Sequence, residues 1–515
     1  MGDGVIFLYD RAMGRHGTFT GGIDLPDEKH PTKDRAVEAF SLSASSVVRV
    51  PLSWDGRAGA VVVVSAGQRV RAGERIARAV TGGVDVFAPL AGVVGPVGRV
   101  RVACGGEWEL VDALELGDLG PWTLPASESA SESEPSSEPA FDWRACDGDA
   151  LRDRLAEGHL VLHRRRPEPL TPFVERARRR SVRTLIVNAM EHQPYVTADH
   201  RVLAEHGRGV LTGAAILARA IGVRQTHLAA DHRSVRTYGD LPSAAEELGV
   251  HLVALTHKYP IGADTILVNV LTRRETPVGG EVMDVGSAVV DAATCLAVFG
   301  WVVCGQRPAG RVVTVAGERV VRPGNVYVPW GLSVAEVLSA VPVLHGGPMA
   351  ALDCPPDAVV GPATDALLAI RMPKHQSPGV CIRCGWCTDY CPARLNVTAL
   401  NDTFELGRVD QARKLGVEAC MGCGVCSYVC PARLPLSQRV RSLRRIVASH
   451  RSTGVPPVSR MGVSPMQRGP GSDGSESAGA ATLSRDETPA NRATGETPVG
   501  RMGETPMLRD VEGRP

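Results

Sequence analysis

Eight of the 13 cysteines in this chain fall into two runs with identical spacing. The first run is Cys381, Cys384, Cys387 and Cys391, followed by Pro392; the second is Cys420, Cys423, Cys426 and Cys430, followed by Pro431. Both runs read C-x2-C-x2-C-x3-C-P, the spacing with which thiolates hold cubane iron–sulfur clusters. Gly385 and Gly424 lie inside the runs, where the absence of a side chain lets the backbone pass close to inorganic sulfide.

The fourth cysteine of each run is expected to bind the cluster of the other run, as in two-cluster ferredoxins. The first [4Fe-4S] cluster would then be held by Cys381, Cys384, Cys387 and Cys430, and the second by Cys420, Cys423, Cys426 and Cys391. Structural zinc is disfavoured because it needs two separated C-x2-C pairs, not three evenly spaced cysteines before a Cys-Pro. A disulfide framework is disfavoured in so long a chain.

The whole-chain composition sets broad limits on the protein. Its 515 residues allow three or four domains, and the formal charge of +1 implies no strongly charged partner. The sequence has neither an apolar run of about 18 residues nor the basic-then-apolar start of a signal peptide. We therefore expect a protein in the reducing cytoplasm that reaches membranes only through partner subunits.

The first third of the chain is rich in short β signals. Residues 1–45 read as a loop-like N-terminal segment, and residues 46–105 place apolar residues between evenly spaced glycine turns. The latter pattern resembles a lipoyl-like barrel-sandwich domain. No lysine lies between Lys33 and Lys258, so this domain should be unmodified. Residues 106–141 read as a linker that contains an acidic low-complexity stretch.

The rest of the chain divides into further domains. Residues 142–305 alternate strands and helices, which predicts an α/β domain: strands at 184–188, 226–230 and 251–255, helices at 210–222 and 241–248. Residues 306–345 form a smaller β module that alternates with period two and turns at Pro323–Gly324. A connector (346–372) leads to the cluster domain (373–448), in which residues 409–419 look helical and residues 440–447 should form a helix packed on the domain. The tail (449–515) reads as disordered.

The order of these parts resembles the RnfC family, which belongs to the Rnf/Rsx ion-translocating electron-transport complex. The resemblance runs from about Gly17 to Arg444, which is most of the chain outside the linker and tail. It rests on the barrel, both cysteine runs and these motifs: Phe19–Ile23, Leu185–Asp199, Lys258–Pro260, Pro277–Gly280, Asp284–Gly286 and Gly346–Met349. It implies an α/β domain like the flavin-bearing subunit of respiratory complex I, a soluble-ligand-binding β-grasp module and a two-cluster ferredoxin domain, which we expect to be helical.

The resemblance also implies a flavin region around Asn188 and Glu191, which would contact FMN or NADH. Just before the Leu185 strand the family carries a glycine-rich loop whose backbone approaches the flavin phosphate. This chain has no glycine between Gly158 and Gly207, and it has Arg164–Arg166 and three prolines between residues 159 and 173. His192 and Gln193 replace the usual Cys and Glu. We therefore expect weak or absent FMN and NADH binding, unless the arginines contact a phosphate instead.

Three functions remain open at this point. The first is a peripheral electron-relay subunit of an Rnf-type membrane complex, on the cytoplasmic face of the plasma membrane, which passes electrons between NAD(H) or ferredoxin and membrane subunits and is coupled to ion translocation. The second is a soluble flavin and iron–sulfur reductase of the cobalamin-reductase type. The third is an adaptor that keeps its clusters but has lost FMN and NADH binding. The sequence leaves open whether the chain oxidises NADH on its own.

Overall fold

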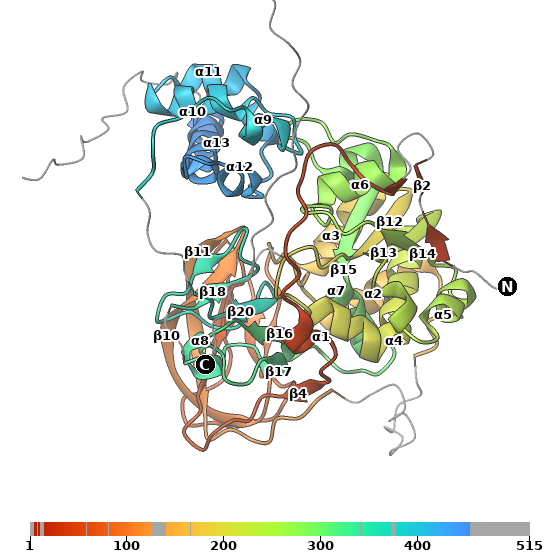
Figure 1. The fold of residues 1–515 in the computed structure, drawn as a ribbon. Coiled ribbons are helices and arrows are strands. Elements are labelled where there is room, and N and C mark those ends of the chain that lie inside the picture. Colours follow the sequence, from red (N-terminus) through yellow and green to blue (C-terminus); the bar gives the residue numbers. More distant parts are fainter. Residues whose placement is uncertain are drawn as a thin grey trace, which may run out of the picture. The chain divides into compact units, whose positions relative to one another are not determined.

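The computed structural model describes residues 5–7, 9–10, 15–57, 59–80, 82–125, 141–164, 166–339, 342–371 and 377–453 (Figure 1). Most of the expected acidic low-complexity stretch lies outside these residues, at 126–140, as does the expected disordered tail from residue 454 onward. Residues 449–453 belong to a helix, so the tail boundary at 449 was placed too early.

Two small antiparallel sheets form the barrel-sandwich domain and share one aliphatic core. Their strand orders are β5-β11-β10-β7 and β6-β8-β9. The strands are β5 (Val48–Pro51), β6 (Ala60–Val62), β7 (Arg69–Val70), β8 (Arg75–Ala79), β9 (Val86–Phe87), β10 (Gly92–Cys104) and β11 (Glu107–Gly117). Val50, Val70, Ile76 and Leu90 are buried, as the period-two pattern predicts.

Strand β11 corrects the boundary that we expected at residue 105. It pairs with β10 from Cys104 opposite Glu107 to Val93 opposite Gly117, and with β5 on its other side. Leu114 and Leu116 are buried in the core, while Glu107 and Asp112 are exposed. The acidic residues that suggested a linker are therefore the outward-facing side of a strand, and the linker interpretation is wrong for residues 106–117.

The N-terminal segment is not the loop that we expected over residues 1–45. Strand β1 (Val5–Phe7) joins the sheet of the α/β domain, β2 (Tyr9–Asp10) pairs with β3 (Arg15–His16), and a short helix, α1 (His30–Lys33), follows. Strand β4 (Val37–Ala39) pairs in parallel with β17, far along the chain. Such distant partners are invisible to a local reading of the sequence.

A parallel five-stranded sheet with order β1-β14-β13-β12-β15 forms the α/β domain. Its remaining strands are β12 (Thr184–Ala189), β13 (Gln225–Asp231), β14 (His251–Leu255) and β15 (Ser287–Asp291). Its helices are α2 (Gly148–Gly158), α3 (Leu170–Arg179), α4 (Ala198–Ile221), α5 (Leu241–Glu247), α6 (Asp264–Thr272) and α7 (Ala292–Val302). The expected strands are confirmed, and α4 ends at left-handed Gly222 as predicted but begins well before Val210.

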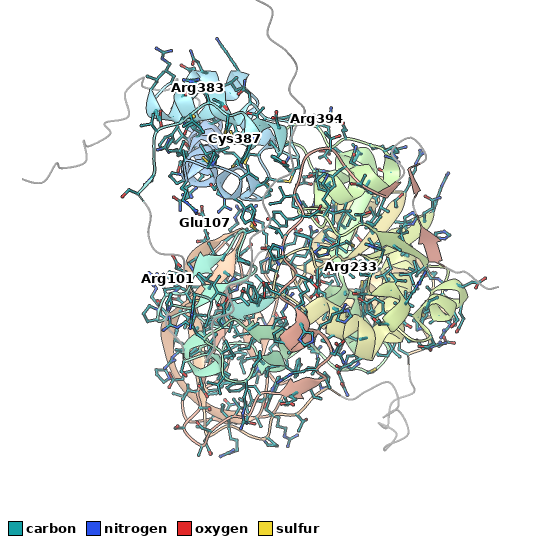
Figure 2. The ribbon with its side chains drawn as sticks, in the orientation of Figure 1. Arg101, Glu107, Arg233, Arg383, Cys387 and Arg394 are labelled. Carbon is teal, nitrogen blue, oxygen red and sulfur yellow. The ribbon has the colours of Figure 1, made fainter. Side chains whose placement is uncertain are left out.

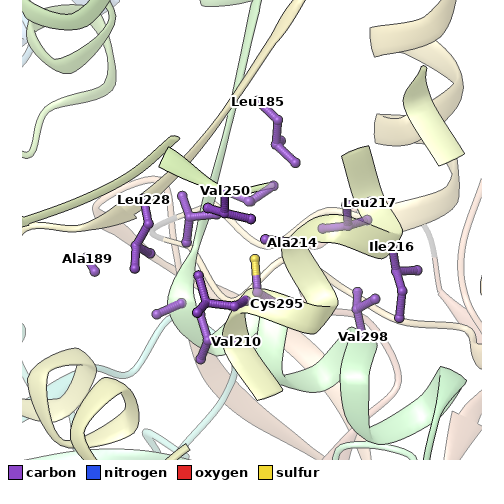
Figure 3. Packing of buried hydrophobic residues seen from close by; sticks show 14 of the residues in the cluster. Leu185, Ala189, Val210, Ala214, Ile216, Leu217, Leu228, Val250, Cys295 and Val298 are labelled. Atoms are coloured by element: carbon purple, nitrogen blue, oxygen red, sulfur yellow. The ribbon is translucent and has the colours of Figure 1, made fainter. Parts of the chain in front are cut away.

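Helices α4 and α7 pack closely against each other in the core of this domain (Figure 3). Ala214, Leu217 and Val298 are fully buried there together with Cys295. A side chain at Gly213 of α4 would meet the backbone of α7, since an ideal Cβ would lie 1.8 Å from the carbonyl oxygen of Cys295. The glycine therefore sets how closely the two helices approach.

The β module is larger than expected. Its sheet has six strands in the order β19-β18-β20-β16-β17-β4. They include β16 (Gly310–Ala316), β17 (Gly324–Pro329), β18 (Leu344–His345), β19 (Leu352–Asp353) and β20 (Ala366–Leu368), and a short helix, α8 (Val334–Val337), follows β17. The β16–β17 hairpin is confirmed, but its loop spans 317–323 and Gly324 begins β17. The connector expected over 346–372 instead supplies β19 and β20.

The cluster domain is built from short helices around its own core. They are α9 (Trp386–Asp389), α10 (Val397–Glu405), α11 (Val409–Lys414), α12 (Val425–Tyr428) and α13 (Leu436–Thr453). Leu400, Leu443 and Val447 are buried in this core. The expected helix at 409–419 is split into α11 and a 3-10 turn at Val417–Ala419. The segment 440–447 lies in α13 and packs on the domain, as predicted.

Candidate functional site

Both cysteine runs adopt the same local structure. In each, a glycine with positive φ precedes a short helix: Gly385 (φ 83) before α9 and Gly424 (φ 84) before α12. A Cys-Pro pair follows each helix, and then an arginine with φ of 53°, Arg394 or Arg433. A side chain would strain the backbone at the glycine, which explains why each run has one there. Figure 2 shows Cys387 among these helices.

The thiol groups of the second run lie near Cys391 of the first. Burial raises the pKa of the Cys426 thiol, and the neighbouring Cys423, Cys420 and Cys391 raise it further. Burial likewise raises the pKa of Cys391, where nearby Cys420 and Cys387 add to the effect. Iron binding must displace the protons of such thiols, so metal loading and ionisation are coupled. The fourth cysteine of the first run thus shares its electrostatic surroundings with the second run.

The cysteines do not converge as the ligands of one metal ion would. Within the described part of the chain, no group of three or more His, Cys, Asp or Glu side chains is placed to hold a single ion. A cubane differs because each thiolate binds a different iron atom, so its four ligands surround a larger body. The doubled spacing, the glycine turns and the partly apolar surroundings of six of the eight cysteines fit such a body.

The second run packs against the rest of the chain. The Tyr259 hydroxyl donates to the carbonyl oxygen of Cys423 at 2.5 Å, and the Arg444 guanidinium donates to the carbonyl oxygen of Cys420. Gly424 has no side chain, and an ideal Cβ there would lie 2.3 Å from the carbonyl oxygen of Met349. The second cluster would therefore form beside the body of the protein.

Asn188 lies where we expected it, at the carboxyl end of β12, but its side chain is bonded within the protein. Its Nδ2 donates to the carbonyl oxygen of Gly262 at 2.8 Å, and its Oδ1 accepts from the Met190 amide at 3.1 Å. The neighbouring His192 ring accepts from the Gly262 amide at 2.9 Å. These contacts close the chain segments around β12 onto each other.

Glu191 supports a helix. Its Oε1 accepts from the Asp199 amide in the first turn of α4 at 2.7 Å, and Lys29 donates to its backbone carbonyl. Burial raises the pKa of Glu191 to about 7, although Lys29 and the backbone donors oppose this shift. The cavity beside it measures only about 20 Å³, which is room for little more than one water molecule. A flavin ring does not fit there.

Sequence reasoning missed the polar network that fills this edge of the sheet. Burial would raise the pKa of Asp231, but hydrogen bonds from His257 (2.7 Å) and Arg233 (2.8 Å) outweigh it and hold the pKa well below its usual range. Arg233 also reaches Asp27 at 3.2 Å. The available signal was an aspartate directly after a buried parallel strand, at the edge where such sheets place functional side chains.

The arginine stretch does not form an anion cradle at Arg164. The Arg164 guanidinium pairs with Asp264 in the first turn of α6 and donates to the carbonyl oxygen of Val289 at 2.6 Å. Arg165 lies outside the described residues. Arg166 lines a cavity of about 760 Å³, together with Arg394, Arg444 and Cys420. The residues around Asn188 and Glu191 thus do not fit an FMN, and only Arg166 of the described arginines in this stretch lines a roomy cavity.

Three family models match consecutive parts of the chain. Residues 17–113 match the RnfC barrel sandwich hybrid domain, residues 171–300 the Nuo51 FMN-binding domain, and residues 374–431 a 4Fe-4S dicluster domain. The barrel match agrees with the structure in including most of β11. The FMN-domain match begins after the arginine stretch. The chain therefore carries a domain for two [4Fe-4S] clusters and a domain of flavin-binding ancestry.

Curated relatives share one description, that of the C component of an ion-translocating oxidoreductase complex. The chain is 28% identical to this component from Edwardsiella ictaluri, over 73% of this chain and 47% of that protein. It is 26% identical to the corresponding component of the proton-translocating ferredoxin:NAD(+) oxidoreductase complex of Clostridium ljungdahlii, over 75% and 84%. It spans only 28% of the Erwinia tasmaniensis relative, so the lengths of these proteins vary widely.

The relative from Rhodobacter capsulatus, which has the same description, is 30% identical over 77% of both chains. Solved structures of an NAD+-reducing [NiFe]-hydrogenase are also similar, at 17% and 19% identity and TM-scores of 0.41 and 0.42, over 62% and 64% of this chain and 70% and 67% of theirs. The barrel, the two cysteine runs and the extent of the Rhodobacter match together place the chain in the RnfC family of the ion-translocating oxidoreductase complex.

Proposed function

We propose that this protein is a peripheral electron-relay subunit of an Rnf-type ion-translocating oxidoreductase complex. It passes single electrons through two [4Fe-4S] clusters, and so acts as an enzyme only as part of the complex. The observation that carries this proposal is the doubled cysteine run, whose two copies share one local fold and bring Cys391 near Cys420 and Cys426. Two clusters in one small domain form a chain for electron transfer.

The residues of the cluster domain have three tasks in this role. The eight cysteines hold iron: Cys381, Cys384, Cys387 and Cys430 for one cluster, and Cys420, Cys423, Cys426 and Cys391 for the other. Gly385 and Gly424 form the turns that bring the backbone close to each cluster. The helical core around Leu400 and Leu443 keeps water from part of each cysteine. The bound clusters supply the reversible one-electron chemistry.

The partners belong to the proposal as well. The Clostridium ljungdahlii relative is described as part of a ferredoxin:NAD(+) oxidoreductase, which suggests ferredoxin and NAD(H) as the redox partners of the assembled complex. Membrane subunits on the cytoplasmic face of the membrane would receive or supply the electrons. We also keep the β-grasp interpretation of the module around β16 and β17, which is supported by its antiparallel hairpin and the short helix α8.

A second function is favoured by one observation. Because Arg164 is paired with Asp264 and the cavity at Glu191 is small, the α/β domain could have become a scaffold. The chain would then relay electrons through its clusters without oxidising NADH itself. The cobalamin-reductase alternative needs a bound flavin, and these contacts weigh against it.

Anaerobic purification and chemical analysis test the proposed function. We expect about eight iron and eight sulfide ions per chain, as two cubanes require, and reversible bleaching of the cluster absorbance by dithionite. Stoichiometric zinc without sulfide would overturn the proposal. Flavin analysis of the same sample separates the full relay from the scaffold version.

A further inference from the structure

The two cysteine runs differ in how far they are open to solvent. Around the first run, the side chains of Val380, Ile382 and Trp386 are 86%, 67% and 50% exposed, and Cys384 is exposed as well. In the second run, by contrast, Gly422, Gly424 and Val425 are buried. The cluster of the first run would therefore lie near the surface.

The second run is covered by the rest of the chain. Val425 is fully buried against Ile23, Leu25 and Tyr259, and Met421 packs on the core of the α/β domain. The Tyr259 hydroxyl bonds to the Cys423 backbone. The second cluster would therefore be the inner one, next to the α/β domain.

Five exposed apolar or aromatic side chains lie around the outer cluster: Val380, Ile382, Trp386, Tyr390 and Tyr428, which we call the outer patch. The last three line an open groove of about 680 Å³ that reaches Cys430, the expected fourth ligand of the outer cluster. The Gly379 amide donates to the carbonyl oxygen of Ala432 at 2.9 Å, which places the segment before Val380 beside Cys430. The patch and the outer cluster thus share one face of the domain.

Charge on this domain favours an acidic partner. Residues 377–449 contain ten arginine or lysine side chains and five aspartate or glutamate side chains. Arg433 and Lys258 line the groove, against Asp24. Basic side chains around an apolar centre match the usual anatomy of a protein interface, and the opposite charge on a partner speeds its approach.

We propose that the outer patch docks a small redox protein whose own cluster is surrounded by acidic residues, and that electrons pass there one at a time. In the step, the partner's reduced cluster loses one electron and the outer cluster of this chain gains it, with no bond made or broken. The inner cluster then connects the outer one to the α/β domain. This inference rests on the proposed function, because it requires two clusters.

Stopped-flow electron transfer tests the docking face. The full-length holoprotein is mixed anaerobically with a dithionite-reduced, acidic two-cluster bacterial ferredoxin, which serves as the probe. We expect Ile382→Glu and Val380→Glu each to slow second-order transfer about tenfold, because a negative charge enters an apolar centre that faces acidic residues. Transfer by the wild type should also slow as salt is added.

Leu406→Glu is the matched control, since Leu406 is 61% exposed on the same domain but lies outside both runs and does not line the groove. Reduction by methyl viologen, which needs no docking face, should be unchanged in all three variants. Equal slowing in Leu406→Glu, or no slowing in either patch variant, would overturn the inference. So would a wild-type dimer that Ile382→Glu dissociates without affecting the ferredoxin rate, because the patch would then bind a second copy.

The two proposals fail in different ways. A protein without iron and sulfide, or with clusters that methyl viologen cannot reduce, would overturn the proposed function itself. Clusters that are intact and reducible, with rates insensitive to the patch, would leave the relay in place and remove only the docking face. Iron content is measured on each variant, so that loss of a cluster is not mistaken for loss of docking.

Discussion

Cys391 is the residue on which the pairing of the two runs depends. It follows the helix of the first run, but its thiol lies near Cys420, and Cys391 in turn affects Cys426 of the second run. We expect Cys391→Ser to damage the same cluster as Cys423→Ser, because the fourth ligand crosses over. The EPR spectra and iron contents of both variants, compared with Cys384→Ser, provide the measurement. A Cys391→Ser spectrum that matches Cys384→Ser would rule out cross-ligation.

Glu191 gives the fold a dependence on pH. Its pKa of about 7 lies above the ordinary 4.5, so the folded state holds a proton that the unfolded state releases between these values. Stability therefore falls as pH rises from about 4.5 to 7 and changes little from this group outside that window. Lys29, Asp199 and Asp365 are the charged neighbours, and Asp199 has a raised pKa of its own, to which Glu191 contributes.

The substitution Glu191→Gln tests this dependence, because it keeps the oxygen that accepts from Asp199 and removes the titrating proton. Relative to the wild type, the variant should gain on the order of 1–2 kcal/mol in free energy of unfolding between pH 5 and pH 8. Urea unfolding at both pH values measures the gain. A difference between the two proteins that stays constant with pH would contradict the assignment, and Glu191→Ala, which also removes the cap, should be less stable at both.

At the scale of elements, the contact of α4 with α7 is the most constrained part of the α/β core. We expect Gly213→Ala to cost about 3 kcal/mol of folding free energy or to prevent folding, because its Cβ would meet a backbone oxygen that cannot move alone. Gly207→Ala on the same helix is the control, since its Cβ would contact only the end of the Leu241 side chain. Similar urea midpoints for the two variants would show that the helices can separate easily.

The elements that the sequence predicted are those with a local signal. Strands β12, β13 and β14 are short apolar runs because both faces of a parallel sheet are covered. The cysteine runs carry their own spacing and glycines. In contrast, β4, β20 and β11 depend on distant partners or carry acidic outward faces, so they resembled loop, connector and linker.

The flavin region divides in the same way. Asn188 lies at the strand end that the resemblance implied, and its amide is used to bond Gly262. The partners of Glu191 come from Lys29 and from the start of α4, and the pairing of Arg164 with Asp264 joins segments about a hundred residues apart in the chain. Spacing along the sequence carries no information on such contacts, which arise only when the sheet brings its carboxyl ends together.

At the scale of the whole molecule, attachment to a membrane has to be explained without a spanning helix. No helix in the described part of the chain is both long and apolar enough to cross a bilayer. We expect the protein in the membrane fraction of its host when its partner subunits are present, and its release by high salt or a chaotrope. Deletion of a partner subunit should move it to the supernatant. Extraction by detergent alone would contradict attachment through partners.

The last prediction concerns the flavin, on which the role of the whole chain depends. FMN needs backbone N–H groups or cations at its phosphate and a pocket of several hundred Å³ for its ring. Here Arg164 is neutralised by Asp264, the cavity at Glu191 measures about 20 Å³, and Arg166 lines a separate cavity beside Cys420. We therefore expect acid extraction of the purified protein to release far less than one FMN per chain, with slow NADH–ferricyanide activity. Stoichiometric FMN together with fast activity would contradict this expectation, and loss of that flavin in Arg166→Ala would then assign it to the cavity beside the inner cluster.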